Sequence, residues 1–350
     1  MKNLIYALFG ISAVLVIALA GVALLLFLNS DPVTNTHEIN EDFDRIKILT
    51  KTTDVVFLPA DGEIAKVICH EQRKAPCTVS VKDNALTVQS NEEKSVFDFL
   101  SFTYEPKITV YLPKEQYSSL EIEGSTGDMT IPSGFLFESA TIDLSTGDVE
   151  FGADVSADLS INQTTGDAHI EAKISGKLTI DQTTGDAEIE NSSFLGATIT
   201  KTTGDVEIKN TACAENLIID LSTGNVQIEG YESEGLVDIT QTTGDTHLSS
   251  LSCKALKSEG GTGDIDLNNV IGSESFEINR STGNVDLTLC TSSRIRIQTT
   301  TGNVTGSFAK GMSFSASTTT GKVKVPKTSG DPCEIRTTTG NIKITVENSN

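Results

Sequence analysis

Carboxylate side chains recur at a fixed spacing along this 350-residue chain, and they are its strongest candidates for chemistry. Each follows a Thr-Gly pair, and the first five are Asp128, Asp148, Asp167, Asp186 and Asp205. Carboxylate oxygens stacked along one edge of a fold would suit Ca²⁺, as in calcium-binding β-rolls. The chain lacks the Gly-Gly-x-Gly-x-Asp pattern of those proteins, and backbone amides would satisfy the same carboxylates. We therefore expect no cofactor and keep calcium at these five residues as an alternative.

Histidine and the remaining acids form no catalytic or metal pattern in the sequence. His169 and His247 hold the same place in their repeats but lie four repeats apart, roughly 19 Å along a stack of strands. Acids such as Asp143 and Glu150 are spread evenly, as on a solvated surface, without a distinct acid pair, a Ser-His-Asp order or a phosphate loop. We expect no catalytic residue, and keep a polysaccharide-active enzyme as an alternative.

Six cysteines are too few for a dense disulfide framework. Cys69 and Cys77 flank a short loop and would form a disulfide across it in an oxidising compartment. Cys213 and Cys253 hold the same place two repeats apart, which exceeds the reach of a disulfide. We interpret these two, with Cys290 and Cys333, as unpaired residues that fill the interior.

The acids belong to a Thr-Gly-Asp motif that recurs twelve times at intervals of 19 or 20 residues. The first five copies contain Thr126 and Gly127, Thr146 and Gly147, Thr165 and Gly166, Thr184 and Gly185, and Thr203 and Gly204. The later glycines are Gly224, Gly244, Gly263, Gly283, Gly302, Gly321 and Gly340. Asp or Asn follows the glycine in every copy except one, where Lys322 stands. A fixed period of this length is typical of a solenoid, in which each repeat is one coil.

Apolar residues occur seven and five places before each glycine and two and four places after it, with polar residues between them. This alternation predicts two half-buried strands per coil, with glycine supplying the bend because it accepts positive φ. The same alternation predicts that the threonine before each glycine points inward as an internal ladder. The predicted fold is all-β: a single-stranded, parallel and right-handed β-solenoid of about 12–14 coils.

The N-terminal third lacks the motif and divides into three predicted parts. Residues 1–30 contain an apolar run from Leu4 to Leu28, long enough for a transmembrane signal anchor that leaves the N-terminus cytoplasmic and the solenoid extracytoplasmic. Residues 31–45 are expected to be a linker. Residues 46–118 are expected to hold a degenerate first coil, with Thr53 in the glycine position, and a β-rich cap with a hairpin turn at residues 82–84. The repeat solenoid then fills residues 119–350.

The formal charge of −22 is unevenly distributed. Residues 294–350 contain eight Lys or Arg and three Asp or Glu, a net charge of +5, which leaves −27 for the remainder. An acidic shaft argues against nucleic-acid binding. The basic end, with Arg294, Arg296, Lys322, Lys324 and Lys343, would suit an anionic wall polymer, lipid head groups or the acidic flank of another copy. Lys343 in the last coil would blunt edge-to-edge pairing of the sheets.

The segment from Lys107 to Lys114, the stretch from Leu120 to Asp128 and the Thr-Thr-Gly-Asp repeats together resemble the bacterial putative-adhesin family. The resemblance spans about residues 46–346 and implies a parallel β-solenoid outside a bacterial membrane. Members of that family share no binding site, so no functional residue is carried over. We expect a non-enzymatic, membrane-anchored protein for adhesion or cell-wall interaction, with a wall polymer or surface ligand as partner. The alternative is an envelope-stress or regulatory accessory that binds a membrane protein.

Overall fold

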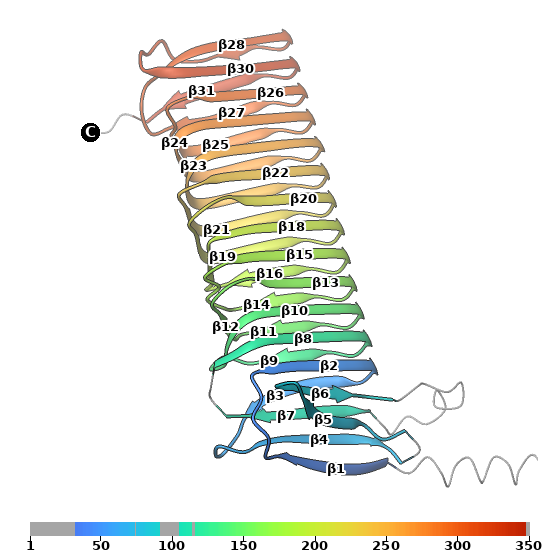
Figure 1. The fold of residues 1–350 in the computed structure, drawn as a ribbon. Helices are drawn as coiled ribbons and strands as arrows, with labels where there is room; N and C mark the ends of the chain where they lie inside the picture. Colours follow the sequence, from blue (N-terminus) through green and yellow to red (C-terminus); the bar gives the residue numbers. More distant parts are fainter. Residues whose placement is uncertain (1–31, 74, 92–104, 114–115, 348–350) are drawn as a thin grey trace, which may run out of the picture.

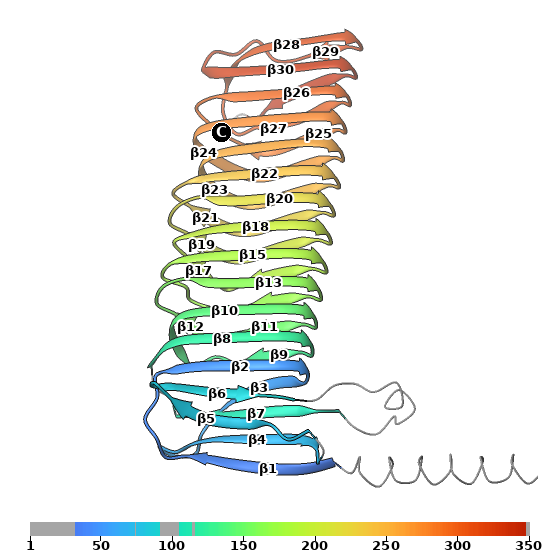
Figure 2. The same ribbon diagram turned by 45° about the vertical axis from the view of Figure 1, so that its right-hand side comes forward.

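The computed structural model describes residues 32–73, 75–91, 105–113 and 116–347, and within them every regular element is a β-strand. The strands stack into a straight rod (Figures 1 and 2). This confirms the all-β, parallel β-solenoid prediction, with about 11 turns between the first and last glycine corners. Among the described residues, no helix is long and apolar enough to cross a membrane. The predicted anchor, residues 1–30, lies outside them.

Each coil contributes one strand to a sheet before the Thr-Gly-Asp corner and one to a sheet after it. The pre-corner strands are β2 (Arg45–Thr52), β8 (Gln116–Thr126), β10 (Leu136–Thr146), β13 (Leu159–Thr165), β15 (Lys177–Thr184), β18 (Gly196–Thr203), β20 (Leu217–Thr223), β22 (Leu236–Thr243), β26 (Ile295–Thr301), β28 (Met312–Thr320) and β30 (Asp331–Thr339). The post-corner strands are β3 (Asp54–Pro59), β9 (Met129–Ile131), β11 (Val149–Phe151), β14 (Ala168–Ile170), β16 (Ala187–Glu190), β19 (Val206–Cys213), β21 (Val226–Ser233), β25 (Val285–Cys290), β27 (Val304–Phe308), β29 (Val323–Lys324) and β31 (Ile342–Val346). Two long strands, β23 (Thr246–Thr262) and β24 (Ile265–Thr282), run from one sheet into the other, and β12 (Asp154–Val155) and β17 (Ser193–Phe194) lie in the return segments.

The interior forms by stacking identical positions of successive coils. Ile142 of β10 pairs in register with Ile161 of β13, which pairs with Ile180 of β15, and all three side chains are fully buried. The corner glycines lie directly above one another and all have positive φ, between 116° and 158°. A Cβ on Gly204 would come 1.8 Å from the carbonyl oxygen of Gly185, so only glycine fits the stacked corner.

The prediction that the threonine before each corner glycine points into the interior is wrong. Thr146, Thr165, Thr184 and Thr203 are exposed, and so are the Ser or Thr residues that precede them. The chain already turns at these two residues, so the alternation ends at the third residue before the glycine. That third position points inward instead.

In seven coils the inward third position carries a polar side chain that donates to a corner carbonyl. Lys201 Nζ donates to Gly185 O at 2.5 Å, and Gln182 Nε2 donates to Gly166 O of the coil before. The same bond is made by Gln163, Gln241, Thr299, Thr318 and Thr337. A buried carbonyl without a donor costs about 1–3 kcal/mol, which explains polar residues in an otherwise apolar interior.

Polar or small residues gather in the interior of three successive coils, those of Gly244, Gly263 and Gly283, and they surround Arg280. Its Nη2 donates to Thr246 Oγ1 at 2.8 Å, Gln241 Oε1 at 3.2 Å and Ser258 Oγ at 3.4 Å. A Cβ on Gly260 would come 1.4 Å from Nη1, so glycine makes room for the guanidinium. Burial lowers the pKa of Arg280 to about 10. The buried arginine therefore accounts for the four polar or small residues around it, Gln241, Thr246, Ser258 and Gly260.

A second corner lies six residues after the glycine in six consecutive coils. The residue there has a φ of 48° to 63°, at Asn191, Asn210, Gly230, Ser250, Asn269 and Leu289. Asn and Gly tolerate this left-handed conformation, whereas it costs other residues roughly 1–2 kcal/mol. The recurring Asn was visible in the sequence but its role was missed.

The N-terminal end is closed by antiparallel strands. Cap strands β1 (Pro32–Ile39), β4 (Ala65–Gln72) and β5 (Thr78–Lys82) join β6 (Ala85–Gln89) and β7 (Lys107–Leu112). Strand β4 pairs antiparallel with both β1 and β7, and β5 with β6 through the predicted turn, where Asp83 and Asn84 have positive φ. The stretch 31–45 was predicted to be a linker, but β1 occupies much of it because its backbone completes the edge of β4.

The order of coils at both ends departs from the order of the sequence. Strand β2 lies between β6 and β8, so the chain passes over the first coil when it runs from β7 to β8. At the other end β30 lies between β26 and β28 (Figure 1). In the same way β31 pairs with both β27 and β29. The Gly340 coil is therefore inserted before the Gly321 coil, which ends the rod. The expectation that the last coil of the sequence forms the end was wrong.

Candidate functional site

The corner Asp and Asn side chains form a continuous hydrogen-bonded ladder along the rod. The amide of Asp148 donates to Asp128 Oδ1 at 2.9 Å, that of Asp167 to Asp148 Oδ1 at 2.8 Å, and those of Asp186 and Asp205 to the preceding Asp at 2.7 Å. The ladder starts at Asp54 of the coil with Thr53 at its corner and ends at the amide of Lys322. Lys322 departs from the pattern because its coil ends the rod, where no further amide needs an acceptor.

This ladder accounts for the carboxylates proposed as calcium ligands. Each of the five accepts a hydrogen bond from the backbone amide of the next coil with one oxygen, so each carboxylate has a structural partner without a cation. Among the described residues, the structure brings one group of potential metal ligands within 4.8 Å of one another, and none of these five carboxylates belongs to it. Calcium binding stays a prediction, and the hydrogen-bonded ladder is a competing explanation for the same residues, Asp128, Asp148, Asp167, Asp186 and Asp205.

An elongated groove of about 640 Å³ runs along the pre-corner sheet across the coils of β2, β8, β10, β13 and β15. Four coil widths make it roughly 19 Å long. One wall is a column of acids and an amide, Glu123, Asp143, Asn162 and Asp181, four residues before each glycine. Beside it stand the exposed hydroxyls of Ser125, Ser145, Thr164 and Thr183. The groove therefore offers mostly hydrogen-bond acceptors in a regular array.

Charge within the groove is partly compensated at one end only. Lys47 Nζ lies 2.6 Å from Glu121 Oε1 and 2.8 Å from Glu123 Oε1. The hydrogen bond from Lys47 lowers the pKa of Glu123, so this carboxylate stays ionised. Further along, Asp143 accepts from Asn162 Nδ2 at 2.5 Å. The middle of the groove is thus a site for groups that donate hydrogen bonds or carry positive charge.

A second groove, of about 650 Å³, lies on the post-corner side of the same coils. Its polar lining includes Glu150, His169 and Glu171, and His169 Nδ1 lies 3.2 Å from Glu188 Oε2. The evenly spread acids that the sequence analysis treated as a solvated surface therefore line two distinct depressions. His247, four coils further along, is far from both.

The predicted basic end is divided between two faces. Lys324 pairs in register with Lys343 on the post-corner sheet, and Lys322 precedes them at the corner. Arg294 and Arg296 lie instead on the side of β26, where Arg296 is 4.0 Å from Glu334. The structure therefore brings together three of the five predicted basic residues.

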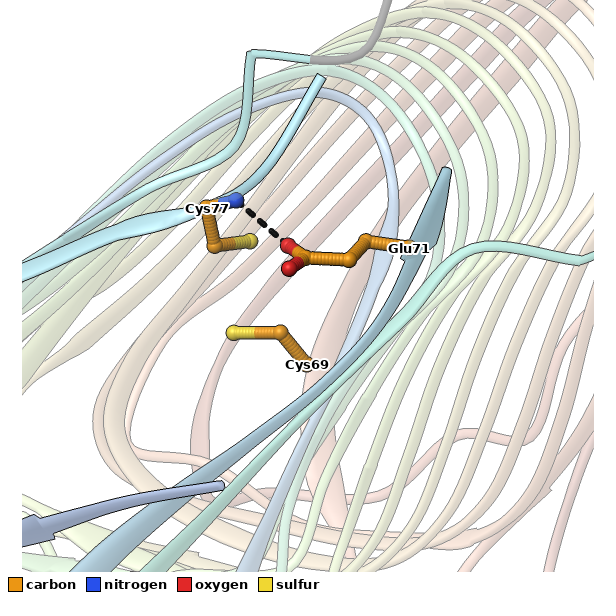
Figure 3. A group of neighbouring side chains, drawn as sticks. All are labelled: Cys69, Glu71 and Cys77. Carbon is orange, nitrogen blue, oxygen red and sulfur yellow. Dashed lines mark hydrogen bonds between the residues drawn. The ribbon is translucent and has the colours of Figure 1, made fainter. Parts of the chain in front are cut away.

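Cys69, Glu71 and Cys77 form a compact cluster in the N-terminal cap (Figure 3). Cys69 and Glu71 lie two residues apart on the same face of β4 and are 0% and 1% exposed. Cys77 directly precedes β5. Their ligand atoms all lie within 4.8 Å of one another, and all six cysteines of the chain are free thiols. A hydrogen bond with Cys69 raises the pKa of the Cys77 thiol, and burial adds to the effect. The Cys69–Cys77 disulfide thus stays a prediction.

Glu71 was missed by the sequence analysis, although alternation along the strand places it beside Cys69. Asn35 Nδ2 donates to Glu71 Oε1 at 2.5 Å, and the Cys77 amide donates to Glu71 Oε2. Cys213, Cys253, Cys290 and Cys333 are buried along the shaft, as expected. Burial raises the pKa of Cys253 and of Cys333 to about 12.

Two segments of the chain, residues 43–229 and 212–345, match the family model described as Toastrack DUF4097. No curated protein matches the sequence. Solved structures with similar folds include a putative adhesin from Bacteroides fragilis, 15% identical, covering 90% of this chain and 97% of its own, with a TM-score of 0.28. A putative lipid binding protein from Parabacteroides distasonis is 13% identical over 79% of this chain and 95% of its own, with a TM-score of 0.36. A putative adhesin from Parabacteroides merdae is 10% identical over 79% and 97%, with a TM-score of 0.37.

Proposed function

The chain belongs to the Toastrack DUF4097 family, and from this premise we propose a non-enzymatic protein of the bacterial cell envelope that binds an extended polymer along its pre-corner groove. The single observation behind the proposal is the groove itself, which follows the rod axis across five coils and repeats an acid or amide together with a hydroxyl in four of them, those of β8, β10, β13 and β15. A polymer with repeating hydroxyl or amino groups matches such an array, because these four coils each offer it an acceptor oxygen four residues before the glycine and a hydroxyl two residues before it. Adhesion to a wall polymer is the role this favours.

Membrane anchoring is part of the proposal. The apolar run from Leu4 to Leu28 would hold the protein in the membrane, with the rod on the extracytoplasmic side. Anchored there, the groove would lie on the coils nearest the N-terminal cap, and the remaining coils would extend the rod away from the bilayer and towards the wall.

Site-specific photo-cross-linking in living cells tests the ligand directly. A photoreactive residue at Thr164 lies in the groove, whereas one at Thr242 is equally exposed at the same place in a coil outside it. We expect capture of wall polymer at Thr164 and not at Thr242. Capture of an integral membrane protein at Thr164 would replace adhesion with the role of an envelope-stress or regulatory accessory.

A matched pair of charge variants tests the chemistry of the groove. Asp143→Asn with Asp181→Asn removes two groove carboxylates, and Asp220→Asn removes the equivalent carboxylate of a coil beyond it. Hydrogen bonds to charged groups contribute about 1.5–3 kcal/mol each, so retention of the full-length protein on isolated wall material should fall at least about tenfold in the double variant. Equal retention in the double variant and Asp220→Asn would show that the ligand binds elsewhere.

A further inference from the structure

We propose that Cys69, Glu71 and Cys77 hold a single divalent zinc-like cation in the N-terminal cap. The three side chains point towards one another from β4 and from the start of β5 (Figure 3). With all ligand atoms within 4.8 Å, small side-chain rotations bring them to tetrahedral separation around an ion with bonds of about 2.0–2.3 Å. This site is independent of the groove and of its proposed ligand.

The donor set specifies the class of metal. Two thiolates suit soft and borderline ions, which disfavours Ca²⁺ and Mg²⁺, and the carboxylate favours Zn²⁺ over Cu⁺. Three protein ligands leave a fourth position for water. Cys77 is only half-buried, so an ion can enter the site from its side.

The surroundings of Glu71 resemble an outer ligand shell. Asn35 of β1 and the Cys77 amide each donate to one carboxylate oxygen, which fixes the carboxylate plane and leaves further lone pairs for a metal. A carboxylate that is 1% exposed is costly without a compensating positive charge, and its two hydrogen-bond donors among the described residues, Asn35 and the Cys77 amide, are both neutral. A divalent ion supplies that charge, and its binding releases the two thiol protons to solvent.

Glu71 also separates this proposal from a Cys69–Cys77 disulfide. A disulfide needs only the two sulfur atoms, and a buried carboxylate beside them contributes nothing to its formation. In a metal site the same carboxylate is a ligand. The two readings therefore make different predictions for Glu71→Gln, which preserves size and an acceptor oxygen but removes the charge.

The test uses the full-length protein, purified under reducing conditions in detergent because of its apolar N-terminal run. Titration with Co²⁺ is expected to give one equivalent of bound ion with an intense thiolate-to-metal charge-transfer band, and Zn²⁺ is expected to displace it. Cys77→Ser should lose the band and weaken Zn²⁺ binding on the order of 100-fold, and Glu71→Gln roughly 10-fold. Cys213→Ser, a buried thiol in the shaft, is the matched control and should bind as the unmodified protein does.

Three results would overturn the proposal. The first is Co²⁺ titration of the unmodified protein without a thiolate band. The second is unchanged Zn²⁺ affinity in Glu71→Gln, a substitution that preserves the size of the side chain and removes only its charge. The third is a Cys69–Cys77 disulfide found by mass spectrometry in the protein as isolated from cells, without bound zinc. Far-ultraviolet circular dichroism of each variant establishes that loss of binding does not reflect loss of fold.

Discussion

Replacement of the buried Lys201 by Gln is expected to stabilise the protein, although it removes two hydrogen bonds of a charged group. Lys201 is 3% exposed and donates to Gln182 Oε1 and Gly185 O, both at 2.5 Å. Gln163, Gln182 and Gln241 hold the same place in other coils and donate to the equivalent glycine carbonyl. Gln at position 201 can therefore keep the bond to Gly185 without burying a charge.

The magnitude follows from the pKa of Lys201, which burial lowers from 10.5 to about 8. Each pKa unit corresponds to about 1.4 kcal/mol, so the protonated side chain costs the folded state up to about 3 kcal/mol. Below pH 8 this cost is present in full, because the lysine is protonated in both folded and unfolded chains. Between pH 8 and 10.5 the unfolded chain binds more protons than the folded protein, so stability rises with pH and the cost disappears.

Hydrogen exchange of the amides in β15, β18 and β20 measures the effect, since a solenoid opens coil by coil. At pH 7, Lys201→Gln should raise the free energy of opening by up to about 3 kcal/mol, and urea unfolding at pH 7, 9 and 10 should show the gain shrinking. Lys177→Gln removes the same charge from an exposed position and should change little. A variant that is less stable at pH 7, or a gain that is independent of pH, would refute the reasoning.

Three further predictions concern the corners. Gly204→Ala should destabilise the rod by at least about 3 kcal/mol in urea unfolding, because its Cβ meets the Gly185 carbonyl, whereas Gly62→Ala, with no atom within 4 Å, should be neutral. Leu289→Asn should stabilise by about 0.5–1 kcal/mol by thermal melting, because Leu289 has a φ of 55°; a lower melting temperature would mean that packing of the leucine side chain outweighs the backbone strain. Addition of millimolar Ca²⁺ should leave the melting temperature unchanged, because backbone amides occupy the corner carboxylates, and a rise of several degrees would restore the calcium alternative.

The sequence pattern predicted the coil but not the side on which every residue lies. Strict alternation placed Ile142 and its equivalents correctly in the interior, because a strand imposes a period of two. It failed at Thr146, since a tight corner turns two consecutive side chains outward and no periodicity describes a corner. The sequence shows the polar column that includes Gln182 and Lys201. It does not show the glycine carbonyl that accepts a hydrogen bond from each of them, because that carbonyl belongs to the neighbouring coil.

Contacts between distant segments explain what else was missed. Ser258 and Thr246 look like random exceptions in apolar columns until Arg280 is placed between them. Glu71 was not grouped with Cys69 and Cys77 because acids are common on exposed strand faces, and its burial depends on the pairing of β4 with β1. The groove has no sequence signature either, since each of its acids also reads as an ordinary surface residue.

The interleaved order of coils at the two ends bears on how the protein is made. The Gly340 coil lies between the Gly302 and Gly321 coils, both of which leave the ribosome before it. Growth by simple addition therefore cannot complete this part of the rod, and the Gly321 coil has no settled neighbour until the Gly340 coil has been made. Once the Gly340 coil is in place, peeling the C-terminus requires removal of an internal layer rather than an outer one. The same arrangement that delays completion thus makes the end resistant to unwinding by force or by proteases that start from the terminus.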